Sequence, residues 1–348
     1  MIQKITLQSI RCFQKAEFKF SPGVNLTIGP NGSGKTTVLE AVLLFVFGRL
    51  QSVSKDFLAV RSGEEVGRVE IQIDTEGEKI EASAAILPGE KVFKVFSNKT
   101  PTSKMIGFVK GVAFNPETID LVSGPPAVRR RELDLAIAEK EPVFVKTLLQ
   151  FKNILKQRNN LLRRIILGKA KKGEIDFWDS ELARHSLEIF SKRKEFLAKI
   201  NRSLGSSYAG LTGRKTNLAL EYLGSADYGK FMECLAGSFD SDLRDGSTQV
   251  GPHRDDFLFR EGKFMMREHS SRGEQRMAAV AFKLEVREFL RGDEEPILVF
   301  DDVFSELDEG RREAVSRVIG KGQVFISATD ERVVPENLKK KAKVLRLE

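Results

Sequence analysis

One stretch of eight residues constrains the fold of this chain more than any other feature. It fits the phosphate-binding pattern G-x-x-x-x-G-K-[ST] at every position and consists of Gly29, Pro30, Asn31, Gly32, Ser33, Gly34, Lys35 and Thr36. A β-branched run precedes it at residues 24–28, and residues 36–47 after it have a helical pattern that ends at Gly48. This order of strand, loop and helix lets successive N–H groups point at a polyphosphate. The sequence therefore predicts binding of ATP or GTP, with Lys35 neutralising the phosphates and Thr36 ligating Mg²⁺.

Length and composition exclude several other classes of protein. A chain of 348 residues is long for one hydrophobic core and predicts two domains. Cys12 and Cys234 match no metal or redox spacing, and the three histidines add no zinc set. The longest apolar run, residues 38–47, is too short to span a bilayer, and the N-terminus lacks the apolar core of a signal peptide. We therefore expect a cytoplasmic protein without a membrane partner.

The positive charge of the chain is concentrated in one segment. The net charge is +8, whereas residues 126–172 contain 13 Lys and Arg against 4 Asp and Glu, a local balance of +9. A basic surface of this kind favours a polyanionic partner. The alternative is a solvated helix face without a partner.

The patterning changes along the chain from strands to helices. Residues 69–74, 79–86 and 92–96 alternate between apolar and polar, which predicts an antiparallel β layer beside the nucleotide site. From residue 115 the pattern is helical, and a basic turn at residues 167–173 separates two long helices.

The two helices predict a hairpin with a basic tip. One carries Leu148, Leu155 and Leu162 at intervals of seven, and the other runs from about residue 176 to 204. The Gly/Ser-rich residues 205–213 after the hairpin predict a linker, and residues 237–246 predict a loop.

A second strong signal lies near the C-terminus. The apolar run at residues 296–300 ends in Asp301 and Asp302, as in a Walker B strand that delivers a carboxylate toward Mg²⁺. A core strand followed by a surface turn is the alternative. Upstream, Ser271 and Glu274 have capping-box spacing at the start of a helix, where an anion can bind. The capping box is weak evidence by itself, because many helices have one.

These motifs together resemble a known family. The phosphate loop, the Ser-x-Gly-Glu segment at 271–274, the two aspartates and residues 305–308 follow the order of ABC-type ATPases. Lys35 and Ser271 lie 236 positions apart, which is too far for a compact transporter subunit. The spacing suits the branch with an inserted helical arm, which includes the structural-maintenance and Rad50-like proteins. Within it, nearly the full chain resembles the RecF family of bacterial recombination mediators, with the most specific marks at 114–131, 250–256 and 301–308.

The resemblance implies an architecture. The fold would be α/β, an ABC-type P-loop ATPase head made of a mixed sheet plus an antiparallel β layer, with an inserted α-helical arm. Residues 1–114 would form the first part of the head and residues 248–348 the second, with the signature helix, Walker B strand and D-loop. The arm would comprise residues 115–247.

The same resemblance implies an ATP-dependent homodimer. Two heads would close around two ATP molecules, so that residues 29–37 of one subunit, ending at Thr37, meet Ser271 and Gly273 of the other across the γ-phosphate. Asp301 would hold Mg²⁺ together with Thr36.

Three further residues receive roles from the family pattern. Asp302 stands in place of the glutamate that orients the attacking water, Asp308 would communicate between the two sites, and Arg11 matches a position that contacts nucleotide in relatives.

The implied function is ATP-gated DNA binding in replication and recombinational repair after DNA damage, within the SOS response. The clamp would help to load a recombinase at gaps, with mediators of the RecO and RecR type as partners and a weak, DNA-stimulated hydrolysis as the reset. The candidate DNA contacts are Lys169, Lys171, Lys172, Arg129, Arg130 and Arg131.

Several positions depart from the wider superfamily. Arg272 stands where many ABC proteins have Gly, Asp302 is shorter than the usual Glu, and Asn115 and Glu117 occupy the switch-loop region without a clear Gln. The His of the last strand is also missing. These departures predict slow turnover. A motor or nuclease-coupled ATPase of the Rad50 kind remains the alternative, although the arm is short and lacks a zinc-hook Cys-x-x-Cys; a transporter ATPase fits less well.

Overall fold

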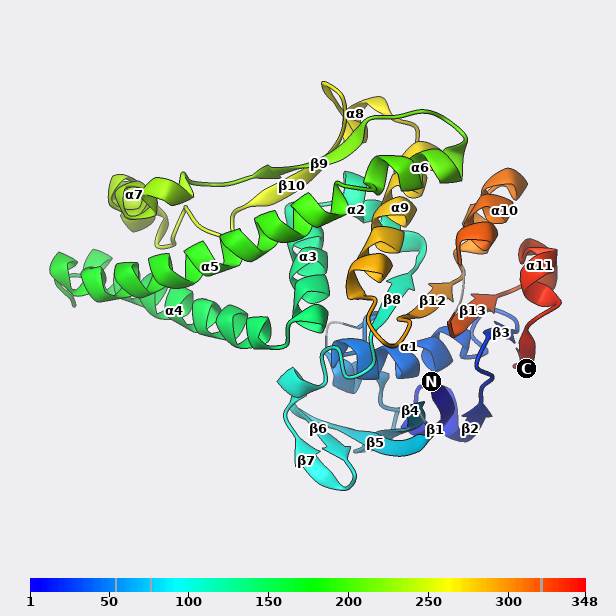
Figure 1. The fold of residues 1–348 in the computed structure, drawn as a ribbon. Helices are drawn as coiled ribbons and strands as arrows, with labels where there is room; N and C mark the ends of the chain where they lie inside the picture. Colours follow the sequence, from blue (N-terminus) through cyan, green and yellow to red (C-terminus); the bar gives the residue numbers. More distant parts are fainter. Residues whose placement is uncertain (54, 76, 320–321) are drawn as a thin grey trace. The chain divides into compact units, whose positions relative to one another are not determined.

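The computed structural model describes residues 1–53, 55–75, 77–319 and 322–348 (Figure 1). Its contacts divide the chain into two compact units. The head unit comprises Met1–Ile119, Ser207–Lys215 and Arg276–Glu348, and the arm unit comprises Asp120–Ser206 and Thr216–Gln275. The head unit is thus built from both ends of the chain.

The division falls at other residues than the boundaries that the family resemblance implied. Residues 248–275 belong to the arm unit and residues 207–215 to the head unit. In the arm unit, β10 (Asp256–Glu261) pairs antiparallel with β9 (Leu218–Leu223), so the ladder ties the later segment to the arm. A sheet pairing between distant segments cannot be read from loop composition.

The head unit contains a parallel sheet that carries the nucleotide motifs. Its described strands lie in the order β14 (Lys343–Arg346), β3 (Val24–Ile28), β13 (Val324–Ala328), β12 (Ile297–Asp301) and β8 (Gly111–Phe114), and each neighbouring pair is parallel. Every residue of β3 and β13 is buried. Both faces of these strands therefore favour apolar or β-branched side chains, and their sequences are short runs made mostly of such residues. The C-terminal ends of parallel strands meet at one edge of the sheet, where a ligand can bind.

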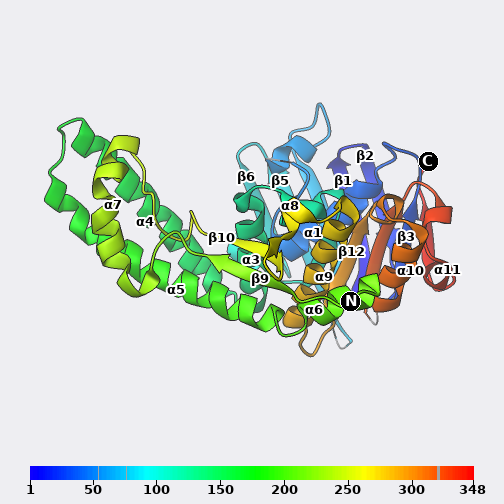
Figure 2. The same ribbon diagram turned by 90° about the horizontal axis from the view of Figure 1, so that it is seen from above.

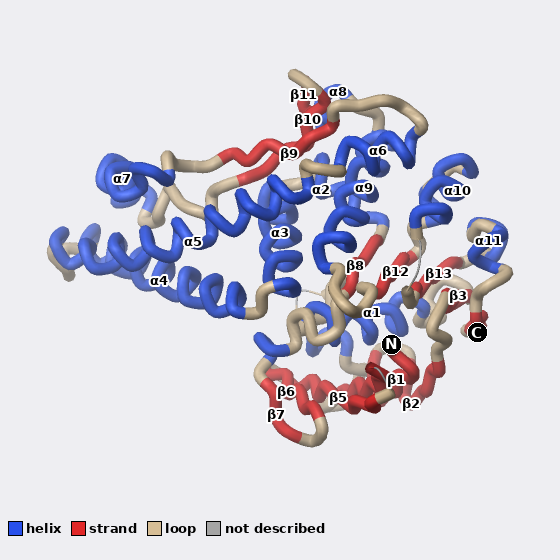
Figure 3. The backbone as a smooth tube through the Cα atoms, viewed as in Figure 1, coloured by secondary structure: helices blue, strands red, loops and turns tan. Residues whose placement is uncertain are grey.

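A second sheet in the head unit, whose strands are drawn in red in Figure 3, is antiparallel. Its strands lie in the order β2 (Phe13–Lys19), β1 (Ile2–Ile10), β4 (Gly67–Thr75), β5 (Glu78–Leu87), β6 (Glu90–Val95) and β7 (Asn98–Thr100). Along β4 the first seven residues alternate between buried and more exposed positions, as expected for a sheet with one face in the core. The predicted strands at 69–74, 79–86 and 92–96 coincide with β4, β5 and β6, so the antiparallel layer is confirmed.

The described α-helices are distributed over both units. The head unit contains α1 (Lys35–Phe47), α6 (Leu204–Thr212), α10 (Glu309–Val318), α11 (Glu336–Lys339) and most of α9 (Arg272–Leu290). The arm unit contains α2 (Asp120–Ser123), α3 (Pro126–Lys140), α4 (Val143–Ile166), α5 (Asp176–Ile200), α7 (Phe231–Asp245) and α8 (Met266–His269). Within the part of the chain that the structure describes, no helix has both the length and the apolar character that crossing a membrane requires.

Helices α4 and α5 of the arm unit form the expected hairpin, with α7 packed beside them (Figure 2). On α5 the buried apolar residues are Leu182, Ala183, Ile189, Phe196, Leu197 and Ile200. The hairpin end carries a small core of Leu161, Leu162 and Ile175. Lys169, Lys171 and Lys172 are exposed in the connection, so the basic tip is confirmed.

Two loop predictions were wrong. Residues 205–213, predicted as a linker, are mostly helix α6, where Leu204, Tyr208 and Leu211 are buried at helical spacing. Residues 237–246, predicted as a loop, lie largely in α7, which ends at Gly246 with φ 61°. In both segments the glycines and serines fill exposed or half-exposed positions of an amphipathic helix, and the burial of one apolar face outweighs their low helix propensity.

Candidate nucleotide-binding site

The phosphate loop connects the end of β3 to the start of α1, as predicted. Gly32 and Gly34 have φ angles of 86° and 96°, a region that side chains other than that of glycine rarely adopt. A Cβ atom on Gly34 would lie 2.5 Å from the ring of Phe13. Glycine is therefore required there. Because Gly34 caps α1 without a side chain, the first N–H groups of the helix face the loop and suit an anion.

Lys35 and Ser33 supply the polar groups of the loop. Lys35 is 7% exposed, and its Nζ donates to the carbonyl oxygens of Gly29 and Pro30, each at 2.8 Å. The hydroxyl of Ser33 is buried without a hydrogen-bond partner. A buried ammonium, an unpaired hydroxyl and helix N–H groups form the donor set that a nucleotide polyphosphate requires.

Thr36 and Asp301 meet at the C-terminal edge of the parallel sheet, which brings the two sequence motifs together. The hydroxyl of Thr36 donates to Oδ1 of Asp301 at 3.1 Å, and that of Ser327 donates to the same oxygen at 2.6 Å. Burial raises the pKa of Asp301, the two hydrogen bonds lower it, and the charges of Glu40 and Asp302 raise it further. Burial and the neighbouring negative charges destabilise the ionised carboxylate of Asp301, so a bound cation would stabilise it.

The residues present fit Mg²⁺. Hydroxyl and carboxylate oxygens are the ligands that this ion prefers, with the remaining positions taken by water and phosphate. Thr36 and Asp301 would hold the ion, and it would neutralise charge on the phosphates.

Asp302 follows Asp301 in a left-handed backbone conformation, with φ 53°. Its N–H donates to the hydroxyl of Ser327 at 3.0 Å, and its carbonyl accepts from Ser305 at 2.6 Å. Its Oδ1 is buried without a hydrogen-bond partner. A carboxylate oxygen held in this way is able to orient a water molecule.

Ser327 was missed by the sequence reasoning. It lies in β13 opposite Asp301 in the parallel register, and its hydroxyl contacts the carboxylate of Asp301 and the backbone N–H of Asp302. The available signal was a polar residue inside an otherwise apolar strand, but its pairing with Asp301 is set by the strand register.

Arg11 lies in the turn between β1 and β2, with φ 47°. Its guanidinium forms an ion pair with the buried Glu40 of α1 at 2.5 Å and a hydrogen bond to Thr37 at 3.4 Å. Arg11 therefore lies against the phosphate-loop helix α1. Its contact with nucleotide stays a prediction.

The capping box at the start of α9 is confirmed. The backbone N–H of Ser271 donates to Oε2 of Glu274 at 2.9 Å, and the N–H of Glu274 donates to the hydroxyl of Ser271 at 3.3 Å. Ser271 is exposed and Gly273 is half-buried. Both belong to the arm unit, whereas the phosphate loop belongs to the head unit.

Asp308 has a local partner set. It is the N-cap of α10, where its carboxylate accepts from the backbone N–H of Arg311 at 2.9 Å. The carboxylate also forms an ion pair with the guanidinium of Arg311 at 2.9 Å. Its predicted part in communication between two sites remains a prediction.

The candidate DNA contacts of α3 differ in exposure. Arg129 is fully buried and forms a bidentate ion pair with Asp256, at 2.7 and 2.8 Å. Arg130 is half-buried and donates to the carbonyl of Asp255 at 2.7 Å. Its pKa is lowered, mainly by burial and to a smaller extent by the positive charge of Arg193. Arg131 is exposed. The burial of Arg129 removes it from the set of residues that a polyanion can reach in this conformation.

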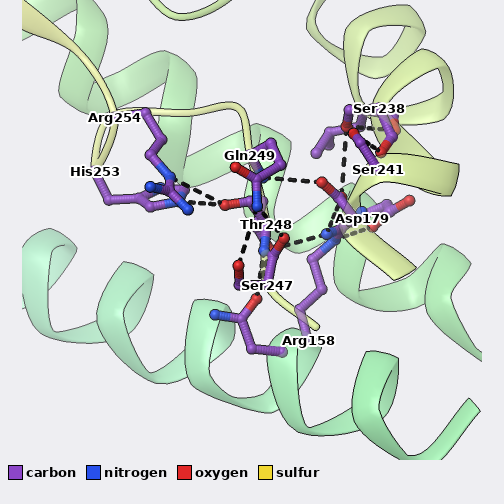
Figure 4. A network of polar contacts seen from close by, with 12 residues as sticks. Arg158, Asp179, Ser238, Ser241, Ser247, Thr248, Gln249, His253 and Arg254 are labelled. Carbon is purple, nitrogen blue, oxygen red and sulfur yellow. Dashed lines mark hydrogen bonds and ion pairs between the residues drawn. The ribbon is translucent and has the colours of Figure 1, made fainter. Parts of the chain in front are cut away.

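A buried polar network in the arm unit was also missed (Figure 4). Arg158 is fully buried and donates to Asp179 and Asp242, each at 2.6 Å, and to Thr248 at 2.8 Å. These residues join α4, α5 and α7 to the segment that leads into His253. The sequence counted Arg158 as surface charge, because composition does not reveal which cation a fold encloses.

Comparisons with known proteins agree with this arrangement. Residues 1–346 match the model of the RecF/RecN/SMC N terminal domain. The chain is 31% identical over 354 residues to the DNA replication and repair protein RecF of Streptomyces avermitilis, covering 96% of this chain and 95% of the relative. It is 31% identical over 362 residues to the protein of the same name of Bacillus thuringiensis, covering 99% and 96%.

Solved structures give the same result. The recombination mediator protein RecF with ATP, described as part of the RecFOR pathway, matches with a TM-score of 0.89 and 31% identity, covering 96% of this chain and 93% of that one. An Smc head bound to the C-winged helix domain of ScpA matches with a TM-score of 0.56 and 16% identity, covering 99% and 93%. This second likeness concerns the fold alone, and the two together confirm the α/β fold of an ABC-type head.

Proposed function

This chain belongs to the RecF/RecN/SMC N-terminal domain family, and within it to the RecF proteins, and from this premise we propose that it is an ATP-dependent DNA-binding protein of DNA replication and recombinational repair. The observation that carries the proposal is the meeting of Thr36 and Asp301 at 3.1 Å, beneath a phosphate loop whose Lys35 is buried. The solved relatives with an ATP ligand in their description support ATP over GTP.

In the proposed cycle ATP acts as a clamp. Lys35 and the loop N–H groups bind the phosphates, and Thr36 and Asp301 bind Mg²⁺. The bound γ-phosphate of one subunit is then contacted by Ser271 and Gly273 of a second subunit, so two heads close only when ATP is present. The exposure of Ser271 at the start of α9 supports this role.

Hydrolysis resets the clamp. Asp302 orients the attacking water through its otherwise unpartnered Oδ1. An aspartate reaches less far than the glutamate more common in ABC proteins, so we expect weak, DNA-stimulated turnover. The closed dimer therefore persists long enough to mark a DNA site.

DNA lies across the closed dimer in this proposal. The exposed cations of the arm unit, Lys169, Lys171, Lys172 and Arg131, contact phosphates. The partners at the site are mediators of the RecO and RecR type, which the naming of the relatives after the RecFOR pathway supports. The complex helps to load a recombinase at gaps.

Sedimentation of the full chain with and without ATP and DNA tests the proposal. We expect a monomer without nucleotide, a dimer with ATP, and a faster species when DNA is added. Ser271→Arg should abolish the ATP-dependent dimer and leave ATP binding within about twofold, because it adds bulk and charge at the γ-phosphate contact without touching the loop. A dimer of parent strength in Ser271→Arg would remove the contact between subunits from the proposal.

A further inference from the structure

One hydroxyl in the head unit contacts both aspartates of the proposed hydrolytic site, the carboxylate of Asp301 and the backbone N–H of Asp302. Ser327 is 1% exposed and lies at the fourth of the five residues of β13. In the parallel register it stands opposite Asp301, so the two side chains project from the same face of the sheet. The strand pairing alone therefore places this hydroxyl beside the Walker B carboxylate.

The hydroxyl makes two bonds in opposite roles. It donates to Oδ1 of Asp301 at 2.6 Å and accepts from the N–H of Asp302 at 3.0 Å. A serine hydroxyl has one proton and two lone pairs, so it can make both bonds at once. Since the carboxylate can only accept when ionised, the direction of both bonds is fixed.

The second bond holds a backbone conformation that is uncommon for a residue with a side chain. Asp302 has φ 53°, a region in which Asp is tolerated but not favoured. Its N–H is held by Ser327 and its carbonyl by Ser305 at 2.6 Å. The direction in which the unpartnered Oδ1 of Asp302 points follows from this conformation.

We propose that Ser327 is a positioning residue for ATP hydrolysis, which sets the side chain of Asp301 and the backbone of Asp302 through one hydroxyl. The inference rests on the proposed function, since it assigns Asp301 to the metal and Asp302 to the water. Without the hydroxyl, Asp301 keeps only the bond from Thr36, and the peptide of Asp302 loses its partner at the end of the ladder. Both groups then sample other orientations.

The competing explanation is that Ser327 only satisfies buried polar groups at a strand end. The two explanations differ in what they change. A structural role alone alters the melting temperature and leaves metal affinity and kcat per folded molecule as they were. A positioning role alters metal affinity and kcat even where the melting temperature is unchanged.

The test compares Ser327→Thr with Ser327→Val, which have nearly the same shape and differ by a hydroxyl against a methyl group. Both are β-branched and suit a buried strand. We expect Thr to keep kcat and Val to lower it about tenfold or more, the effect typical of losing an outer-shell partner. Nucleotide affinity should change less than about threefold in both. Ser327→Ala, the smaller truncation, should behave as Val.

A second readout does not need hydrolysis. Mn²⁺ affinity in the presence of a non-hydrolysable ATP analogue, measured by electron paramagnetic resonance, should fall about tenfold in Val and stay near the parent value in Thr. Ser316→Ala is the matched control, because Ser316 is also buried in the head unit and its hydroxyl donates to the carbonyl of Glu313 in its own helix. It should leave both readouts unchanged.

Equal kcat and equal Mn²⁺ affinity in the folded Thr and Val variants would overturn the proposal. If the parent itself binds nucleotide without hydrolysing it, the hydrolytic part of the proposed function fails. The Mn²⁺ comparison then still decides whether Ser327 positions Asp301.

Discussion

Single residues at the nucleotide site have partners that fix their geometry before any ligand binds. Glu40 illustrates this: it is 4% exposed, pairs with Arg11 at 2.5 Å and accepts the N–H groups of Gln51 and Ser52 at 3.1 and 2.6 Å. The phosphate-loop helix is therefore braced on its side by a buried carboxylate. The sequence predicted Lys35, Thr36 and Asp301 because each belongs to a local motif. It did not predict these contacts of Glu40, because the partners come from two other segments, the turn at Arg11 and the residues Gln51 and Ser52.

Lys35→Ala should weaken ATP binding about tenfold to a hundredfold, since a hydrogen bond to a charged group contributes roughly 1.5–3 kcal/mol. Isothermal titration with the ATP analogue measures this. Lys19→Ala, which removes an exposed cation from β2 of the same unit, should have no effect. Unchanged affinity in Lys35→Ala would place the phosphates elsewhere.

Asp302→Asn should spare ATP binding and lower kcat by about 10²-fold or more, because an amide cannot accept the proton of the attacking water. Asn tolerates a positive φ as Asp does, so the backbone bonds to Ser327 and Ser305 should persist. The ATP-bound dimer should consequently live longer, which a dissociation time course by light scattering would detect. Hydrolysis at the parent rate would show that another group orients the water.

At the scale of elements, the strands and the hairpin were predictable, whereas two helices were not. The strands β4, β5 and β6 alternate strictly enough to be recognised, and α4 with α5 repeats its apolar residues over six turns or more. Helix α7 was hidden because Gly237, Ser238 and Ser241 suggested a loop. Its apolar face is set by Phe231 and Leu235, which are buried against the arm core. Packing therefore decided the structure of a segment whose local propensity favours a turn.

The segment that follows α7 should make the arm unit sensitive to acid through His253. Its Nε2 lies 3.0 Å from the carbonyl of Thr248, its Nδ1 is buried without a partner, and burial lowers its pKa to about 4. The charges of Arg254 and Arg130 lower this pKa, and that of Asp255 raises it. In the unfolded chain the imidazole titrates near 6.5.

Because the unfolded state binds the proton first, His253 stabilises the fold above pH 6.5, and this contribution is lost as the pH falls toward 4. We expect the parent to lose about 2 kcal/mol of unfolding free energy between pH 7 and pH 5 that His253→Gln does not lose. Urea unfolding at both pH values measures the difference. Parallel pH profiles for parent and variant would show that another group carries the sensitivity.

At the scale of the whole molecule, the sequence motifs and the structural units do not follow the same boundaries. The signature residues Ser271 and Gly273 begin a helix whose later residues belong to the head unit. The division was not predictable from composition, since the pairing of β9 with β10 joins residues far apart in sequence.

Charge at this scale is also less simple than the local balance of +9 indicates. Arg129 and Arg158 are fully buried among carboxylates, so they do not contribute to a binding surface. The hairpin tip keeps its charge exposed: Lys169, Lys171 and Lys172 lie there, with Lys172 Nζ 5.5 Å from the ring of Phe239. We therefore propose that the tip is the part of the arm that contacts DNA.

Changing Lys169, Lys171 and Lys172 together to Glu should weaken DNA binding and make its salt dependence shallower. Each phosphate that the parent neutralises contributes about −0.9 to the slope of log affinity against log salt on duplex DNA, so losing up to three contacts per arm should lower the slope measurably. Parent affinity should rise with ATP, because the dimer presents two arms at once and the second contact is intramolecular. The variant should dimerise with ATP as the parent does, since the contact that we propose between subunits involves the phosphate loop, Ser271 and Gly273 and none of the three lysines.

Fluorescence anisotropy of labelled DNA across a salt series, with and without ATP, tests whether the tip lysines bind DNA. In the alternative hypothesis these lysines are solvated or bind an acidic protein. Lys4, Lys15 and Lys19 of the first two strands offer a control in which the same charge is reversed on the head unit. If the tip variant binds DNA with parent affinity and parent slope while the control binds poorly, the DNA site belongs to the head and the arm serves another partner. A loss confined to the tip variant, present only when ATP is bound, is the outcome that two arms closing on one DNA require.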